Sequence, residues 1–256
     1  MKLDSIAGPT SLVLSLAVLA LAGCGRDTVP GNALLGPDAG TTLATAAHTA
    51  PTFNPADFVA VVDNPFFPLV PGTVFNFAAE TPEGSETITI EVLHERKLIL
   101  GVDCTVVRDR VYLEGTLIED TFDWYAQDRA GNVWYLGENV KNYENGVFVD
   151  SEGSWEAGVN GATAGINMQA HPRVGQTYAQ ENAPGIAEDM ATVVSLKETV
   201  TVPYGRFENC LQTMEFSKII PGARGYKFYA RGIGIVLEDS PRGGHERTEL
   251  ISVTRP

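Results

Sequence analysis

The chain alternates short apolar–polar segments with glycine-containing turns over most of its length, and this pattern limits it to a β-rich fold. Residues 87–92 read Thr-Ile-Thr-Ile-Glu-Val, an alternation typical of a strand with one buried face. Neither a long stripe of helical period nor an alternation of strands with helices is visible. We therefore expect a mostly β protein, a single domain of curved antiparallel sheet built as a half-barrel, barrel or sandwich. Further strand-like segments cover residues 102–113, 116–127, 132–140, 175–182, 189–202, 208–217, 225–230, 233–239 and 246–254.

Proline and glycine restrict the segments between these strands. Residues 63–68, Asp-Asn-Pro-Phe-Phe-Pro, cannot be helical, because each proline fixes its own φ and restricts the residue before it. Residues 153–172 are rich in glycine and show no period. We expect a long loop there, which in a compact domain is either mobile or functional.

The charge balance argues against a nucleic-acid partner. The chain carries 18 Lys and Arg against 32 Asp and Glu, a formal net charge of −14. Binding to phosphate backbones requires a basic surface that releases counterions, so we expect no nucleic acid. Acidity also disfavours adsorption to anionic lipid headgroups, so attachment to a membrane requires another device.

The first residues offer such a device. Residues 11–22 form an apolar run that is shorter than the ~20 residues needed to cross a bilayer and has the length of a signal-peptide core. The run ends in Leu21-Ala22-Gly23-Cys24. This tetrapeptide resembles the lipobox of bacterial lipoproteins. An ordinary signal peptide followed by a chance cysteine is the alternative interpretation.

The resemblance to bacterial lipoproteins implies both processing and location. In that family the cysteine thiol receives diacylglycerol, the chain is cut before the cysteine, and the new amino group often receives an acyl chain such as palmitate. Here it implies a signal peptide at 1–23, a lipidated Cys24 and flexible tether at 24–52, and a β-rich exported domain at 53–256. Two or three acyl chains anchor a protein stably. We expect a lipid anchor in the cell membrane or outer membrane, with the domain facing the periplasm or the exterior.

A two-residue turn at 114–115 predicts how the strands around it pair. Two-residue loops are the commonest hairpin class, and this one places Val111 opposite Ile118. The same register places Asp109 opposite Asp120 on an apolar face. Two carboxylates so close cannot both be ionised cheaply. One of them then holds a proton, a cation lies between them, or a buried arginine joins them.

A second turn, at residues 128–132, extends the same face. It places Trp134 opposite Ala126 and Glu138 opposite Phe122. Aromatic rings then surround carboxylates, as in a concave pocket for a polyol, a sugar, an organic cation or a divalent metal. The alternative is an outward face with solvated acids and half-buried rings. The pocket candidates are Asp109, Asp120, Phe122, Trp124, Trp134 and Glu138.

Cys104 and Cys210 remain once Cys24 is lipidated. In an oxidising compartment two remaining thiols favour a disulfide, with two separate buried thiols as the alternative. Each of them follows a glycine by a short run and leads into a strand, an arrangement that resembles the curved sheets of LolA/LolB-like lipoprotein carriers. The segments VDNPFFPLVPG, EDTFDWYAQD and GNVWYLGE also look like an uncharacterised family of exported bacterial proteins, a resemblance that implies no activity.

No catalytic signature stands out. The sequence lacks a G-x-S-x-G elbow and the H-x-x-x-H and C-x-x-C spacings, and we expect neither a cofactor nor a resident metal. We expect a non-enzymatic domain that binds a small ligand or an envelope protein. One alternative is an envelope hydrolase with paired carboxylates among Asp109, Asp120, Glu138 and Glu156, since carboxylates with split pKa values serve glycoside hydrolysis. The other is a purely structural envelope lipoprotein.

Overall fold

The computed structural model describes residues 51–240 and 246–256, so Cys24 and nearly all of the tether lie outside the described residues. The described chain is mostly β, as predicted, with a short 3-10 helix, η1, at Pro55–Asp57. Within the described ranges, no helix is long and apolar enough to cross a bilayer. The strands are β1 (Phe58–Val59), β2 (Val74–Thr81), β3 (Gly84–Ile99), β4 (Val102–Leu113), β5 (Thr116–Asp128), β6 (Val133–Asn139), β7 (Asn142–Glu144), β8 (Val147–Asp150), β9 (Trp155–Glu156), β10 (Thr163–Met168), β11 (Thr177–Ala179), β12 (Glu181–Asn182), β13 (Asp189–Val202), β14 (Gly205–Ser217), β15 (Arg224–Ala230), β16 (Gly234–Ser240) and β17 (Glu246–Thr254).

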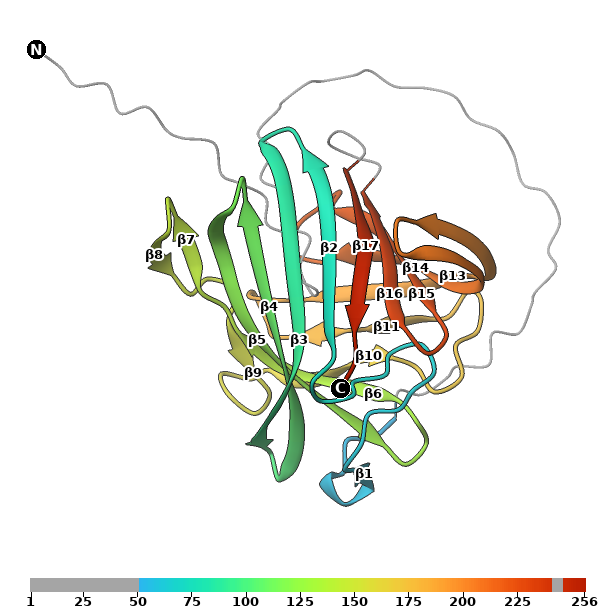
Figure 1. Cartoon of the computed structure of the whole chain (residues 1–256). Helices are drawn as coiled ribbons and strands as arrows, with labels where there is room; N and C mark the ends of the chain where they lie inside the picture. Colours follow the sequence, from blue (N-terminus) through green and yellow to red (C-terminus); the bar gives the residue numbers. More distant parts are fainter. Residues whose placement is uncertain (1–50, 241–245) are drawn as a thin grey trace, which may run out of the picture.

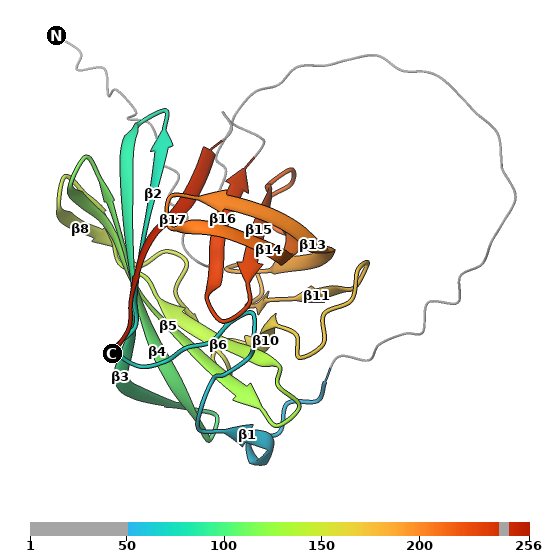
Figure 2. The same cartoon turned by 45° about the vertical axis from the view of Figure 1, so that its right-hand side comes forward.

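One antiparallel sheet curls into a nearly closed barrel (Figure 1). Each strand from β2 to β6 pairs with the next, and so does each strand from β13 to β17. β17 pairs with β2, which joins the two series on one side. On the other side β6 pairs with β10, β10 with β12, and β11 with β13. The two series form opposite walls, β2 to β4 in cyan and green and β13 to β16 in orange and red (Figure 2).

The proline-rich segment before β2 packs against the inward side of β5. Phe66 and Phe67 are buried, and the ring centroids of Phe67 and Tyr125 are 5.2 Å apart. The side-chain oxygen of Gln127 accepts from the backbone N–H of Asn64 at 2.8 Å, which holds the segment in place. Residues 63–68 are therefore not helical, as their prolines predict, and they form a turn that buries both phenylalanines.

Alternation along the strands separates an inward face from an outward one. In β4, Val107, Asp109 and Val111 are buried, whereas Arg108 and Arg110 between them are only half-buried. The inward face mixes apolar residues with carboxyl groups, and this is unusual because buried acids are rare unless they are paired. Besides Asp120 and Asp128, the buried acids are Glu86, Asp109, Glu119, Asp123, Glu138, Glu181 and Asp189.

The β4–β5 hairpin starts as predicted and then departs from the prediction. The two-residue turn is confirmed, but a β-bulge at Ile118 follows it. Beyond the bulge, Asp109 lies opposite Thr121, and Asp120 lies opposite Arg110. The predicted Asp109–Asp120 pair is therefore wrong, because one inserted residue moves every later β5 side chain to the other face.

The β5–β6 hairpin also starts in the predicted register and then departs from it. Trp134 lies opposite Ala126, as predicted. An irregularity near Gly137 then places Glu138 opposite Asp123, so the predicted position opposite Phe122 is wrong. Since cross-strand partners share a face, Glu138 joins Asp123 on the inward side of the sheet.

The stretch 153–172 is not the single long loop that its glycines suggest. It contains β9 and β10, and β10 pairs with both β6 and β12 to close the barrel. A Cβ atom on Gly165 of β10 would lie 2.1 Å from the carbonyl oxygen of Gln180. Glycine at this position therefore permits a close backbone approach instead of marking a loop.

Candidate functional site

A cavity of about 370 Å³ lies where β6 changes partner from β10 to β9. Cavities of roughly 300–1,000 Å³ are typical of small-molecule sites. Two tryptophans and two glutamates line it together with polar and small residues. We call it the β6 pocket; its main lining residues are Lys97, Trp124, Glu138, Asn139, Trp155 and Glu156.

Gly137 allows β9 to approach β6 at this pocket. Its φ is +133°, and a Cβ atom there would lie 2.3 Å from the carbonyl oxygen of Trp155. Any side chain at Gly137 would therefore push β9 away. With β9 in place, Trp155 lies opposite Glu138, and such cross-strand neighbours share a face. The glycine thus brings an indole ring next to a carboxyl group.

Lys97 covers the ring of Trp124 on the outer side of the pocket. Its Nζ lies 3.3 Å from the ring centroid and 2.7 Å from Oε2 of Glu156. The side chains of Lys97 and Glu156 are each 35% exposed, so this ion pair contributes at most about 1 kcal/mol to stability. Its main effect is to fix the outer rim of the pocket.

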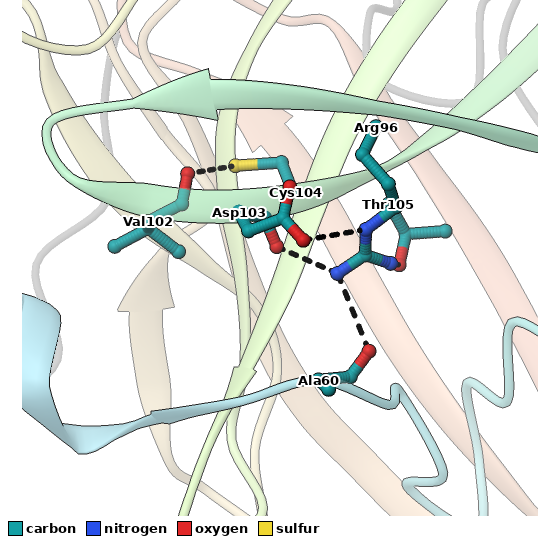
Figure 3. A network of polar contacts seen from close by, with 6 residues as sticks. All are labelled: Ala60, Arg96, Val102, Asp103, Cys104 and Thr105. Atoms are coloured by element: carbon teal, nitrogen blue, oxygen red, sulfur yellow. Dashed lines mark hydrogen bonds and ion pairs between the residues drawn. The ribbon is translucent and has the colours of Figure 1, made fainter.

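Arg96 fixes the strand that carries Lys97 (Figure 3). Its guanidinium donates to the Asp103 carboxylate at 3.1 Å and to the Thr105 hydroxyl at 2.6 Å. It also donates to the backbone oxygens of Asp103 at 2.7 Å and of Ala60 at 3.3 Å. These bonds tie β3 to β4 and to the segment before β2. Because side chains alternate along a strand, Lys97 points to the opposite face, toward Trp124.

Glu138 and Trp155 are buried but incompletely satisfied, with exposures of 1% and 5%. Among the described residues, neither carboxyl oxygen of Glu138 has a hydrogen-bond partner, and neither does Nε1–H of Trp155. The nearby hydroxyl of Tyr135 gives its one proton to Asp123 at 2.6 Å. An unpaired buried polar group costs roughly 1–3 kcal/mol, so the folded state carries such a cost at both residues.

Asp123 and Glu181 extend the acidic surroundings of Glu138. Glu181 is 1% exposed, and neither of its oxygens has a partner in the part of the chain that the structure describes. Burial raises the pKa of Asp123 to about 7 and the pKa values of Glu138 and Glu181 well above their usual range, and mutual repulsion adds to this. Burial therefore favours the protonated forms of these acids, which can donate as well as accept hydrogen bonds.

Of the six predicted pocket residues, Trp124 and Glu138 line the β6 pocket. Asp120 and Phe122 lie on the outward face beside Arg108. The guanidinium of Arg108 donates to Asp120 at 2.7 and 3.0 Å and lies 5.2 Å from the ring centroid of Phe122. The hydrogen bond to Asp120 raises the pKa of Arg108. Arg108 therefore balances the charge of Asp120 on the outward face, away from the predicted partner Asp109.

The other two predicted residues, Trp134 and Asp109, lie elsewhere. Nε1–H of Trp134 donates to Asp128 at 2.9 Å, and its ring packs against Phe53 and Phe58. Trp134 therefore anchors the first described residues. Asp109 is 1% exposed on the inward face. The structure thus divides the six residues between the two faces of the sheet.

Cys104 and Cys210 are free cysteines, in contrast to the predicted disulfide. Each is fully buried, Cys104 in β4 and Cys210 in β14. Burial raises the pKa of the Cys104 thiol to about 12 and also raises that of Cys210. Since only the thiolate is a good nucleophile, both act as small apolar core residues.

Three residues of the site carry no clear signal in the sequence. Lys97 lies on a long polar strand, Glu181 lies beside other polar residues, and Trp155 lies in a glycine-rich stretch. The cue for Trp155 is the isolated aromatic residue itself. Its position beside Glu138 depends on the role of Gly137, which becomes visible only when β6 and β9 are paired.

Comparisons of the chain with protein-family models, with curated proteins and with solved structures find no match. No group of three or more His, Cys, Asp and Glu side chains in the two described ranges is placed to hold a metal ion. The resemblances to bacterial lipoproteins and to LolA/LolB-like carriers stay predictions.

Proposed function

We propose that this protein is a lipid-anchored binding protein of the cell envelope that takes a small polar ligand in the β6 pocket without transforming it. The anchor is Cys24, and residues 24–52 serve as the tether. The β-rich domain supplies the ligand site.

The observation that carries the proposal is a cavity of small-molecule size, lined by two tryptophans and by charged side chains. Glu138 and Nε1–H of Trp155 lack partners within the described chain, and both residues line the same cavity of about 370 Å³. Trp124 adds an aromatic wall. Mostly apolar walls with a few convergent polar groups are the usual design of small-molecule sites.

A blocking substitution tests the binding site. Ile186 lines the pocket and is 42% exposed, so Ile186→Trp should obstruct the pocket without disturbing the core. Ile251→Trp, at a position on β17 that is 40% exposed, is the matched control. Ligand-detected NMR with a panel of sugars, polyols and aminopolyols should show binding that Ile186→Trp abolishes and Ile251→Trp retains. Equal binding to both variants, or no binding by any compound, would contradict the proposal.

The anchor is tested separately. We expect Cys24→Ser to leave the protein soluble or uncleaved and unable to partition into detergent, because a polar serine cannot carry the diacylglycerol. Normal detergent partitioning and acylation of this variant would contradict the anchor and leave the pocket proposal in place.

A hydrolase is the second candidate function, because Glu138 and Glu156 both line the pocket and have contrasting environments. Burial raises the pKa of Glu138, as a general acid requires, whereas Glu156 forms an ion pair with Lys97. The pairing of the strands argues against this function. Glu138 lies opposite Trp155, so the next residue, Glu156, points to the other face. If the wild type hydrolyses members of a glycan panel and Glu138→Gln does not, the function is catalysis and not binding alone.

A further inference from the structure

The hairpin of β7 and β8 stands at the outer edge of one barrel wall (Figure 1). β7 pairs with β5, and β8 pairs with β7. The two residues of the turn between them, Asn145 and Gly146, have φ values of +51° and +75°, as a two-residue turn of type I′ requires. The other long side of β8 faces away from the barrel in both views (Figure 2).

The backbone of β8 presents hydrogen-bonding groups on this outer side. Glu144 and Val147 flank the two-residue turn and form the hydrogen-bonded pair of the hairpin. In an antiparallel ladder the next pair, here Tyr143 and Phe148, does not exchange hydrogen bonds. The backbone N–H and C=O of Phe148 therefore point away from β7. We call Val147–Asp150 with these outward groups the β8 edge.

The side chains of β8 are unusually apolar for the edge of a sheet. Val147, Phe148 and Val149 are 67%, 53% and 48% exposed. Proteins ordinarily protect such edges from other chains with charges, prolines or bulges. The ring of Tyr143 lies 6.1 Å from that of Phe148 on one face of the hairpin, and the two valines point to the other face. An added strand would therefore bury apolar surface on both faces.

Carboxylates flank this apolar segment. Glu144 lies at the turn, Asp150 and Glu152 lie at the other end of β8, and all three are exposed. The side chain of Asn142 donates to the Asp150 carboxylate at 2.7 Å, and the backbone N–H of Glu152 donates to it at 3.0 Å. These hydrogen bonds lower the pKa of Asp150 and fix its position. Because residues 142–153 contain no Lys or Arg, a segment of matching charge is basic at its ends.

The same carboxylates distinguish between kinds of partner. Two copies joined through β8 would place the acids of each copy beside those of the other, and the whole chain carries a net charge of −14. Acidic side chains also oppose contact with anionic lipid headgroups. A basic strand from another protein meets neither obstacle.

We propose that the β8 edge binds an extended segment of a partner protein by strand addition, and that this segment has alternating apolar side chains with Lys or Arg at its ends. The backbone groups of Phe148 provide the pairing, and the exposed apolar side chains of β8 provide the contacts on both faces. The β6 pocket is lined by other segments of the chain. The inference therefore depends neither on the ligand proposed for that pocket nor on the lipid anchor.

The test measures the binding of three dye-labelled peptides to the full chain by fluorescence anisotropy. The first is Lys-Thr-Val-Thr-Val-Thr-Val-Lys. The second has glutamate in place of both lysines, and the third carries N-methyl groups on two adjacent central residues, which removes a donor from each of its edges. We expect the first peptide to bind at least about tenfold more tightly than either of the others.

Three variants locate the binding. Phe148→Pro removes an N–H that points away from β7, so it should keep the hairpin and weaken the basic peptide at least about tenfold. Phe148→Ala is the matched control, because it keeps that N–H, and it should weaken the peptide less. Asp150→Asn should reduce the preference for the basic peptide over the acidic one. The indole N–H signals of the three tryptophans report whether each variant keeps the barrel.

Contrary results have separate meanings. Equal binding by Phe148→Pro and Phe148→Ala, or equal binding of the N-methylated and unmodified peptides, would overturn strand addition. Equal binding of the basic and acidic peptides would overturn the basic partner, and failure of all three to bind would overturn the proposal as a whole. A dimer of the chain that Phe148→Pro dissociates would assign the β8 edge to a second copy. Binding of the Cys24→Ser chain to phosphatidylglycerol vesicles, lost on adding Phe148→Ala, would assign it to lipid.

Discussion

Two groups of largely buried carboxyl groups share the barrel, and they are satisfied differently. In the lysine cluster, the Nζ of Lys227 lies 3.1 Å from Glu215 and 4.0 Å from Glu238. Glu215 also accepts from the hydroxyls of Tyr229 and Thr213, each at 3.1 Å. Burial lowers the pKa of Lys227, but the two glutamates outweigh this and raise it overall. A charged lysine therefore belongs to the folded state.

The Glu138 cluster (Asp123, Glu138 and Glu181) is the opposite case. Its one hydrogen bond among the described residues is that from Tyr135 to Asp123. Burial raises the pKa values of all three acids, as it also raises that of Glu238 in the lysine cluster to about 7. The comparison shows a lysine paired with its carboxylates in one cluster, and mostly unbonded carboxyl oxygens among the described residues in the other.

The largest expected effect on stability comes from removing the lysine of the lysine cluster. Lys227→Met leaves Glu215 and Glu238, whose side chains are 13% and 12% exposed, without their cation. Breaking a buried ion pair in this way costs about 3–5 kcal/mol. Chemical denaturation near neutral pH should show this loss in the free energy of unfolding. The loss should shrink at low pH, where the glutamates become protonated. A change below about 1 kcal/mol would mean that the two clusters do not differ as described.

Removing a charge from the Glu138 cluster should raise the free energy of unfolding, in contrast to the loss expected for Lys227→Met. The pKa of Asp123 in the fold is about 7, above that of the unfolded chain, so ionisation opposes folding. This penalty is absent below about pH 4, grows as the pH rises and is complete above about pH 7. Asp123→Asn keeps an acceptor for Tyr135 and should raise the free energy of unfolding by up to about 4 kcal/mol above neutral pH. Asp189→Asn is the control with a smaller gain, because burial raises the pKa of Asp189 only to about 6. A gain independent of pH would contradict this assignment.

Displacing β9 should damage the Glu138 cluster through the backbone. Gly137→Ala forces a Cβ atom against the carbonyl oxygen of Trp155 and should cost about 2–4 kcal/mol. Gly115→Ala is the matched control, since its φ is +78° and no heavy atom lies within 4 Å in the described structure. It should lose only about 1–2 kcal/mol from the left-handed backbone. Thermal unfolding compares the two variants, and equal losses would show that β9 does not press on β6.

The smallest effect is expected for a carboxylate that already has its partner on the outward face. Asp120→Asn removes the charge that Arg108 binds. Because Arg108 is 34% exposed, the loss should be about 1 kcal/mol and should weaken in high salt. Denaturation at two salt concentrations measures it. A stabilising effect would indicate that Asp120 faces another acid, as the predicted register had it.

The strand pattern is readable from the sequence because alternation and turns are local properties. β4, β13 and β17 match the predicted segments residue for residue. The sequence does not predict β2 or β10. The alternation in β2 includes small residues, and the glycine in β10 serves backbone packing. The bulge at Ile118 is not predicted either, because nothing near it in the sequence marks an unpaired residue.

The site is harder to predict because the polar residues point inward. Alternation normally assigns apolar residues to the core, yet Asp123 and Glu138 face inward while Trp124 and Trp134 lie on the outward face. These outward rings are covered by Lys97 and by the first described residues rather than by the sheet itself. Such coverage comes from segments distant in sequence, which a register argument on two hairpins cannot include.

The most direct measurement follows the three indole N–H signals of the protein by NMR, because the chain has three tryptophans. Nε1–H of Trp134 is bonded to Asp128, whereas that of Trp155 has no acceptor among the described residues. On addition of a compound from the ligand panel that binds, we expect the Trp155 signal, assigned with Trp155→Phe, to move, because Trp155 lines the β6 pocket. The Trp134 signal should stay in place. A titration that leaves the Trp155 signal unmoved, or moves it no more than the Trp134 signal, would contradict ligand binding in the β6 pocket.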